Sequence, residues 1–163
     1  MTRADTGDAA ARPLVHLYSD GSCKPNPGAG GWAAILISPR SGRRRELSGA
    51  VAESTNNRME LTAAIMGLRA LKRPCRVVAH TDSRYLRDAF AAGWLTRWQE
   101  NGWRTADKKP VLNKDLWQEL LELAQVHDIS WIWIRSHADN VENNRCDELA
   151  NLARERLQAS AGK

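Results

Sequence analysis

Four acidic residues that lie far apart in the sequence carry the side-chain type that binds hard metal ions. Asp20 and Asp82 each follow directly after a short apolar run, whereas Glu60 and Asp147 lie in segments with helical periodicity. If the two apolar runs are parallel neighbours in a sheet, both aspartates reach the same sheet edge, which is where open α/β sheets build their sites. Glu60 falls in the first turn of the helix that leads to the second run. Asp147 borders the apolar stripe of the last helix, so it can face the sheet.

Each acid also has a simpler structural explanation. Asp20 and Gly21 form a common turn dipeptide, and Asp82 could be the N-cap of the helix that follows it. Glu60 could complete a capping box with Asn57, and Asp147 could be a solvated position on a helix surface.

The four acids together favour a metal centre. Four carboxylates in one pocket repel one another and raise one another's pKa unless cations compensate their charge. Two divalent ions match that charge, and oxygen ligands without a cysteine or histidine cluster favour Mg²⁺, with Mn²⁺ as a substitute. Two ions about 3.5–4 Å apart can activate a water and stabilise the leaving oxygen of a phosphodiester.

The elements that must position these acids follow a βββαβ order, then helices, then a final strand and helix. Alternating or continuous apolar runs predict the strands and the i, i+3, i+4 pattern predicts the helices. We expect an α/β fold with a mixed five-stranded sheet, in which three antiparallel strands precede two strands parallel to the first, flanked by helices. The expected strands are 14–19, 31–38, 46–52, 76–81 and 129–135, and the expected helices are 57–73, 83–92, 95–100, 115–127 and 142–158.

The composition limits the class of protein. The length of 163 residues suits one domain, which we place at 14–158 between a disordered tail (1–13) and a short tail (159–163). The sequence holds no apolar run long enough for a membrane span and no secretory leader pattern, so we expect a cytoplasmic protein. Its three cysteines are widely spaced, which argues against a disulfide framework. The net charge of +5 weakly favours a polyanionic partner.

Five segments, in order, resemble the bacterial type 1 ribonuclease H family, and they cover the chain from about residue 14 to residue 156. The match is specific because the segments occur together and in the family's order. They are DGSCKPNPGAGGW from Asp20, TNNRMEL from Thr55, TDSRYL from Thr81, GWRTADKKPV from Gly102 and ENNRCDELA from Glu142.

The resemblance implies an endonuclease that hydrolyses the RNA strand of RNA–DNA hybrids with two metal ions and leaves 5′-phosphate and 3′-hydroxyl ends. By the matching motifs, Asp20 would bridge both ions and Asp147 would help to hold the ion that activates water. Glu60 and Asp82 would help to hold the ion beside the leaving oxygen. His137, ten residues before Asp147, would transfer a proton or assist product release. A monomer is expected.

The resemblance also implies substrate contacts. The glycine-rich segment after Asp20 would lie in the minor groove of the hybrid, where backbone can approach sugars and amide groups can contact 2′-hydroxyls. The positions that match groove contacts are Cys23 (through its backbone), Asn26, Asn56 and Asn57. Thr55 and Asn113 match positions that bind a DNA phosphate, whereas Trp94 and Trp98 match a protrusion that grips the DNA strand. Tryptophan is usually buried, so core packing is the alternative for both.

The sequence departs from the family pattern in three places. The protrusion from Trp94 to Pro110 is less basic than in many relatives, and Glu53 stands where relatives often carry an arginine near the DNA phosphate. The segment SHADNVEN has fewer glycines, which predicts a stiffer loop around His137 in which Asp139 favours the protonated imidazole.

Two other functions remain alternatives. One is a nuclease or strand-transfer enzyme of the same fold class that acts on DNA, and the other is a binding module without catalysis. The hybrid-reading segments argue against the first, and the presence of all four acids argues against the second.

Overall fold

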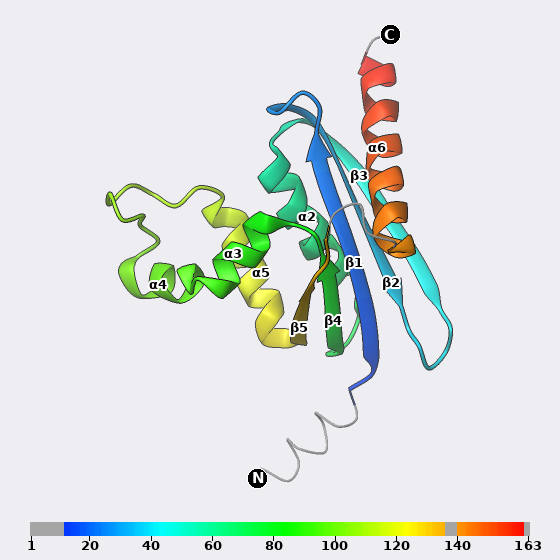
Figure 1. The fold of residues 1–163 in the computed structure, drawn as a ribbon, viewed down its shortest axis with the longest axis horizontal. Coiled ribbons are helices and arrows are strands. Elements are labelled where there is room, and N and C mark those ends of the chain that lie inside the picture. The colour runs from blue at the N-terminus through cyan, green and yellow to red at the C-terminus, as the bar shows by residue number, and fades with distance from the viewer. Residues whose placement is uncertain (1–11, 136–139, 162–163) are drawn as a thin grey trace.

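The computed structural model describes residues 12–135 and 140–161, which form one sheet with helices on both faces (Figure 1). The strands are β1 (Leu14–Cys23), β2 (Gly28–Ile37), β3 (Arg44–Ser54), β4 (Arg76–Thr81) and β5 (Asp128–Trp133). The helices are α2 (Asn56–Arg69), α3 (Arg84–Ala91), α4 (Trp94–Asn101), α5 (Lys114–Val126) and α6 (Val141–Ala161).

The sheet has the strand order β3-β2-β1-β4-β5. β1 pairs antiparallel with β2, and β2 pairs antiparallel with β3. β4 is parallel to β1, and β5 is parallel to β4. This topology confirms the expected mixed sheet, and it places the chain's first crossover between β3 and β4, through α2.

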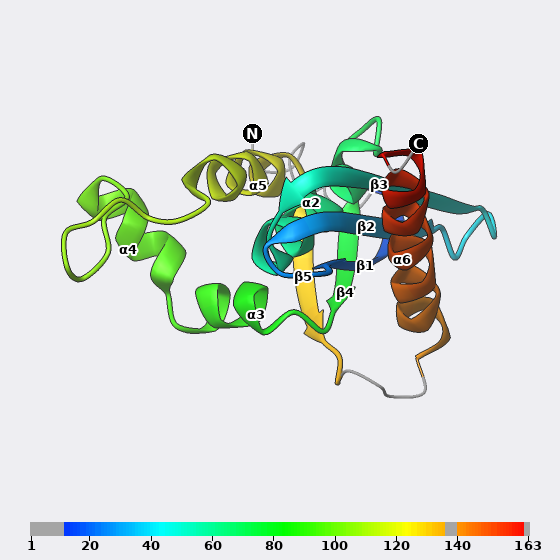
Figure 2. The ribbon, with the colours of Figure 1, turned by 90° about the horizontal axis from the view of Figure 1, so that it is seen from above.

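The two faces of the sheet carry separate apolar cores. Leu17, Leu61, Leu68 and Val77 belong to the larger core, which α2, α3 and α5 cover. Ala33, Ile35, Cys146 and Ala150 form the smaller core between β2 and α6. Seen from above, α6 lies over one side of the sheet and α2 over the other, while α4 projects away from both (Figure 2). Among the described residues, no helix is long and apolar enough to cross a membrane.

The first strand is longer than the sequence predicts. β1 was expected to end at Ser19, but its pairing with β2 continues through Asp20, Gly21 and Ser22 as far as Cys23 opposite Gly30. Only the parallel pairing with β4 stops earlier, at Tyr18 opposite His80. The antiparallel partner therefore extends β1 beyond the apolar run, and Asp20 lies inside the strand rather than in a turn.

The observed helix caps exclude the simpler structural explanations for two of the acids. Thr55, not Asn57, is the N-cap of α2, because its hydroxyl accepts a hydrogen bond from the Arg58 backbone N–H at 3.2 Å. Ser83, not Asp82, is the N-cap of α3, because its hydroxyl accepts from the Leu86 N–H. These caps free Glu60 and Asp82 from the capping roles that were their structural alternatives.

Ion pairs link the first turns of α6 to β3. Arg44 of β3 donates to Glu142 at 2.5 Å, and Arg145 of α6 donates to Glu46 of β3 at 3.0 Å. The helix then continues to Ala161, three residues beyond its predicted end at Gln158. Because these pairs link the two elements crosswise, they fix the position of α6 on the sheet just before Asp147.

Candidate functional site

Three of the four predicted acids converge. Asp20 from β1, Glu60 from α2 and Asp82 from the end of β4 each offer a carboxylate oxygen, and these oxygens lie within 4.8 Å of one another. They meet where the chain switches from antiparallel to parallel pairing beside β1, so the site occupies the switch point of the sheet. Three distant stretches of sequence thus form a single acidic cluster.

Two glycines let helices come close enough to build this cluster. A Cβ at Gly21 would lie 2.4 Å from the backbone carbon and oxygen of Met59, so α2 can approach β1 only where no side chain stands. A Cβ at Gly31 would lie 2.0 Å from the Ala150 carbonyl oxygen, so α6 approaches β2 in the same way. The glycines after Asp20 therefore bring Glu60 and α6 toward the sheet, a role that does not depend on contact with a sugar.

Asp147 borders the same cluster. It lies on the exposed side of α6, and its carboxyl lies within hydrogen-bonding reach of Asp20, where its charge also raises the Asp20 pKa. The structure therefore brings Asp147 to the acidic cluster, but as an outer member that solvent reaches.

Burial and mutual repulsion perturb the acids strongly. Asp20 is only 9 % exposed, and its pKa is raised from 3.8 to about 8 by loss of solvent and by the charges of Asp82 and Asp147. The Glu60 pKa is also raised well above its ordinary value, by burial first and then by Asp20 and Asp82. Without a cation, the cluster therefore holds protons at neutral pH that isolated carboxyls would have lost.

The donor set fits a divalent cation. The Oε2 atom of Glu60 is buried and has no hydrogen-bond partner among the described residues. A buried carboxylate oxygen without a partner is costly, and a coordinated ion would supply the missing interaction. Because the donors are all carboxylate oxygens, they suit Mg²⁺ or Mn²⁺ better than softer ions.

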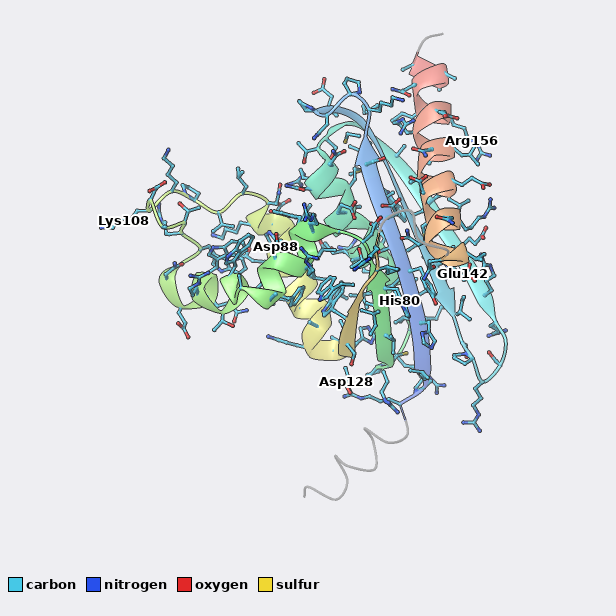
Figure 3. The ribbon with its side chains drawn as sticks, in the orientation of Figure 1. His80, Asp88, Lys108, Asp128, Glu142 and Arg156 are labelled. Atoms are coloured by element: carbon cyan, nitrogen blue, oxygen red, sulfur yellow. The ribbon has the colours of Figure 1, made fainter. Side chains whose placement is uncertain are left out.

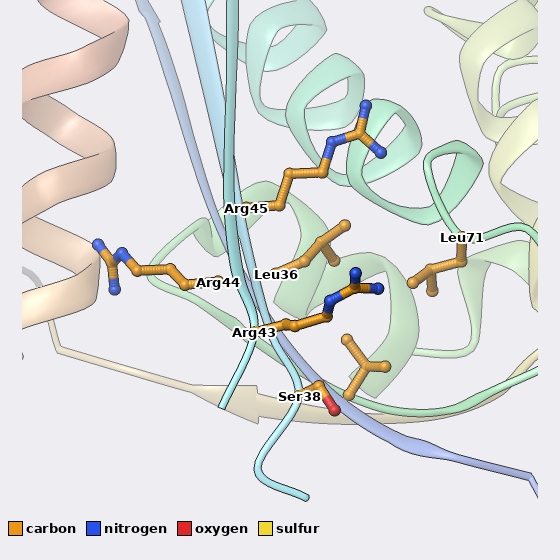
Figure 4. A pocket seen from close by; sticks show the side chains of 7 residues that line it. Leu36, Ser38, Arg43, Arg44, Arg45 and Leu71 are labelled. Carbon is orange, nitrogen blue, oxygen red and sulfur yellow. The ribbon is translucent and has the colours of Figure 1, made fainter. Parts of the chain in front are cut away.

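A separate pocket lies at the opposite end of β1. It has a volume of about 550 Å³, with Val15, Leu36 and Leu71 among the residues that line it. Figure 4 shows Arg43 and Arg45 on its α2 side, whereas Arg44 points toward α6. The described residues that line it include no carboxylate. Its charge would repel a cation, so this pocket is not the metal centre.

The two predicted phosphate-binding residues lie on either side of an arginine. The Arg58 side chain donates to Asn113 Oδ1 at 3.2 Å and forms an ion pair with Asp115 at 2.8 Å. The Arg58 backbone N–H donates to the hydroxyl of Thr55. Asn113 in turn donates to the Tyr85 hydroxyl at 3.1 Å. Sequence reasoning did not single out Arg58, although it lies in the TNNRMEL segment. The sequence did contain an indication, because Arg58 is a cationic residue three positions after Thr55, which was expected to bind phosphate.

The predicted groove residues form a hydrogen-bonded chain. Asn56 Oδ1 accepts from the Cys23 N–H at 2.7 Å, and Asn26 Oδ1 accepts from the Asn56 N–H at 3.1 Å. Asn57 is exposed beside them at the start of α2. The backbone N–H of Cys23 already donates to Asn56, so this N–H is not free to bind a ligand. The amide groups of Asn26 and Asn56 retain their side-chain N–H donors for a ligand.

The predicted protrusion is anchored by tryptophan rings that pack at tilted angles. Trp98 packs against Trp94, Trp103 and Trp117 at ring-centroid distances of 5.9, 6.0 and 5.9 Å. Trp94 and Trp98 are half-buried, so packing explains part of each ring and leaves part exposed. Lys108 lies toward the outer end of this protrusion (Figure 3). His137 lies outside the described residues.

A mixed sheet with acids gathered at its switch point defines the ribonuclease-H-like class of nucleases. The sequence profile described as RNase H matches residues 12–155, and the chain belongs to this family.

Named relatives agree with this assignment. The chain is 56% identical to "Ribonuclease H" of Moorella thermoacetica over 85% of this chain and 90% of the relative. It is 54% identical to "Ribonuclease H" of Hydrogenovibrio crunogenus over 88% of this chain and 97% of the relative. The chain is therefore similar, over nearly its whole length, to bacterial proteins that bear this name.

Solved structures show the same fold. The structure of LC9-RNase H1, a type 1 RNase H with the type 2 active-site motif, matches with a TM-score of 0.78 and 33% identity, over 88% of this chain and 73% of that one. LC11-RNase H1, solved in complex with an RNA/DNA hybrid, matches with a TM-score of 0.68 and 22% identity, over 88% of this chain and 99% of that one. The comparisons thus confirm the predicted fold class and the predicted family.

Proposed function

We propose that this ribonuclease H cleaves the RNA strand of RNA–DNA hybrids by hydrolysis assisted by two divalent ions, leaving 5′-phosphate and 3′-hydroxyl ends. The observation that carries the proposal is the convergence of Asp20, Glu60 and Asp82 within 4.8 Å. Family membership adds the substrate class, because a relative of the same fold was solved with an RNA/DNA hybrid. The catalytic unit is proposed to span residues 14–158.

The carboxylates would hold the ions, which we propose to be Mg²⁺. Bound ions would lower the pKa of a coordinated water and stabilise charge on the leaving oxygen. Asp20 is central, because it contacts the other acids from inside β1 and its own pKa responds to both Asp82 and Asp147. Glu60 approaches from the α2 side with a buried oxygen, and Asp147 closes the cluster from α6.

His137 is proposed to move a proton at the attacking water or the departing product. The proposal rests on the sequence, where His137 stands ten residues before Asp147 in a segment that resembles the family's histidine loop. A His137→Ala variant should therefore lower turnover and change the pH–rate profile, whereas an unchanged rate and profile would remove His137 from the mechanism.

A phosphate of the DNA strand is proposed to bind at Thr55, Arg58 and Asn113. The three residues come from the start of α2 and the start of α5, and Arg58 links the two elements. An arginine suits phosphate because its planar guanidinium donates several hydrogen bonds at once. Its present partner Asp115 is exposed, so a phosphate could compete with this ion pair at modest cost.

The 2′-hydroxyls of the RNA strand are proposed to meet the amide groups of Asn26, Asn56 and Asn57. The hydrogen-bonded chain from Cys23 through Asn56 to Asn26 holds two of these side chains beside the first turn of α2. Contacts of this kind distinguish RNA from DNA at a given position. The exposed parts of Trp94 and Trp98 would then lie against sugars of the DNA strand.

The chain is proposed to act as a cytoplasmic monomer. Its three cysteines, Cys23, Cys75 and Cys146, are free and buried in the structure. Free thiols of this kind are typical of reducing compartments.

The test is cleavage of three labelled duplexes of one sequence: an RNA–DNA hybrid, duplex RNA and duplex DNA. We expect Mg²⁺-dependent cleavage of the RNA strand in the hybrid, and loss of that cleavage in EDTA and in the Asp20→Asn variant. Preferred cleavage of duplex DNA would favour a DNA nuclease of the same fold. Binding of the hybrid without cleavage would favour a non-catalytic module.

A further inference from the structure

A pair of histidines on the sheet is distinct from the acidic residues, although His80 is only two residues before Asp82, and the pair has no part in the proposed mechanism. The Nδ1 atom of His16 on β1 is 3.0 Å from the Nε2 atom of His80 on β4. The two rings are stacked with a centroid distance of 5.2 Å, and the ring of Tyr18, also on β1, stacks with His80 at 4.3 Å. Two side chains that ligate metals are thus held together by neighbouring strands.

The strand register fixes the pair. His16 lies opposite Val78 and Tyr18 lies opposite His80 in the parallel β1–β4 ladder, so the two histidines are diagonal neighbours on one face. That face is the one on which α6 packs against β1, β2 and β3. His80 lies near the centre of the sheet (Figure 3), and Ile132, opposite His80 on β5, is 46 % exposed. Both histidines are half-buried, so the edge of the pair is open to small solutes.

The distance between His16 Nδ1 and His80 Nε2 is compatible with a metal ion bound to both nitrogens, as well as with a hydrogen bond between them. Two nitrogens in adjacent positions of a square or octahedral ion, each about 2.0–2.1 Å from the metal, lie about 2.8–3.0 Å apart. The same nitrogens in a tetrahedral site would lie about 3.3 Å apart. The observed nitrogen–nitrogen distance of 3.0 Å therefore matches the first geometry.

We propose that His16 and His80 chelate a borderline divalent transition ion, with Cu²⁺ and Ni²⁺ preferred over Zn²⁺. Imidazole nitrogen selects such ions, whereas the carboxylates at Asp20, Glu60 and Asp82 select hard ions. The bound ion takes the Nδ1 lone pair of His16 and the Nε2 lone pair of His80. The ring protons then lie on His16 Nε2 and His80 Nδ1, and water completes the coordination.

The other described histidine does not compete for the ion. His127 is buried, and its Nδ1 accepts a hydrogen bond from the Cys75 N–H at 3.1 Å. The proposed ion site shares no ligand with the acidic cluster, so the proposal stands whether or not the chain cleaves a hybrid.

The test is Ni²⁺ calorimetry and Cu²⁺ electron paramagnetic resonance on the full chain, in excess Mg²⁺ that occupies the acidic cluster, with His16→Gln, His80→Gln and, as matched controls, His137→Gln and Asp20→Asn. We expect one equivalent of Cu²⁺ with coupling to two nitrogens, and an at least tenfold weaker Ni²⁺ affinity in either pair variant. Both controls should retain the parent signal. A parent signal that survives His16→Gln, or that His137→Gln or Asp20→Asn abolishes, would overturn the proposal.

A second measurement covers variants that fold poorly. In excess Mg²⁺, saturating Ni²⁺ should further raise the melting temperature of the parent and of both controls, because the acidic cluster is then occupied and Ni²⁺ binds the folded histidine pair. In the same excess of Mg²⁺, the pair variants should show no Ni²⁺-dependent rise above the melting temperature that they have without Ni²⁺. An equal rise in a pair variant would place the ion elsewhere and refute the assignment.

Discussion

Replacing Asp20 by asparagine should stabilise the metal-free protein at neutral and alkaline pH. Folding raises the Asp20 pKa from 3.8 to about 8, so between these values the folded state holds a proton that the unfolded chain has lost. Stability therefore falls as pH rises through this window, by up to about 1.4 kcal/mol per pH unit for one group. Asparagine does not ionise, so this loss of stability with rising pH is absent in the variant.

The size of the effect follows from the same window. Between pH 4 and pH 7, the full pKa shift would lower the free energy of unfolding of the parent by at most about 4 kcal/mol. Glu60, Asp82 and Asp147 share the repulsion, and these three acids would remain neighbours of one another in the variant. We therefore expect Asp20→Asn to gain about 2 kcal/mol at pH 7.5, or roughly 4–8 °C in melting temperature for a domain of this size.

The assay is urea unfolding of parent and variant in EDTA at pH 4.0, 7.5 and 8.5. The two proteins should differ least at pH 4.0, where the parent acid is protonated in the folded state and half-protonated in the unfolded one. Added Mg²⁺ should then stabilise the parent and leave the variant almost unchanged. A variant that is no more stable than the parent at pH 8.5 in EDTA would refute the argument that the acids repel one another.

Three further predictions concern helix position, substrate and protons. Gly21→Ala should lower the free energy of unfolding by about 2–3 kcal/mol and reduce hybrid cleavage, because its Cβ would overlap the Met59 backbone; a melting temperature equal to the parent's would show that α2 is not so constrained. Arg58→Ala should weaken hybrid binding and reduce the salt slope of log K by about 1, whereas Arg69→Ala, at the other end of α2, should change neither; equal slopes in salt titrations of both variants would exclude the phosphate contact. Mg²⁺ binding at pH 7 should release about one proton, since the ion favours the charged form of Asp20, and calorimetric heats that are the same in buffers of different ionisation enthalpy would contradict this.

The strands and their relative directions could be predicted because patterns of apolar residues act locally. The run from Leu14 and the run from Arg76 each carry enough β-branched and apolar residues to indicate a strand, and the intervening helix requires a crossover to a parallel neighbour. The approach of Asp20 to Asp82 follows from these two facts alone.

The boundaries could not be predicted because they depend on tertiary contacts. β1 extends to Cys23 only because β2 offers an antiparallel partner, although the extension begins with Asp20 and Gly21, two residue types that are depleted in strands. The N-cap of α2 is Thr55 and not the candidate Asn57. Both residue types are good N-caps, so the sequence does not rank them.

The supporting contacts of the site were the least visible in the sequence. The glycine-rich segment was expected to serve the substrate, yet Gly21 and Gly31 are required where α2 and α6 cross the sheet. Arg58 was overlooked because its role depends on Asn113, which lies 55 residues away in sequence. Residue type predicts the acids, whereas only the folded chain shows which neighbours hold them in place.

The central claim is that Asp20, Glu60 and Asp82 share divalent cations, and diffraction from crystals grown with Mn²⁺ at pH 8 tests it most directly. We expect an anomalous peak within about 2.5 Å of an Asp20 carboxylate oxygen and in contact with Glu60 or Asp82. Crystals of Asp20→Asn under the same conditions should lack that peak. Saturating Mn²⁺ that leaves no peak beside Asp20, or an unchanged peak in the variant, would contradict the account.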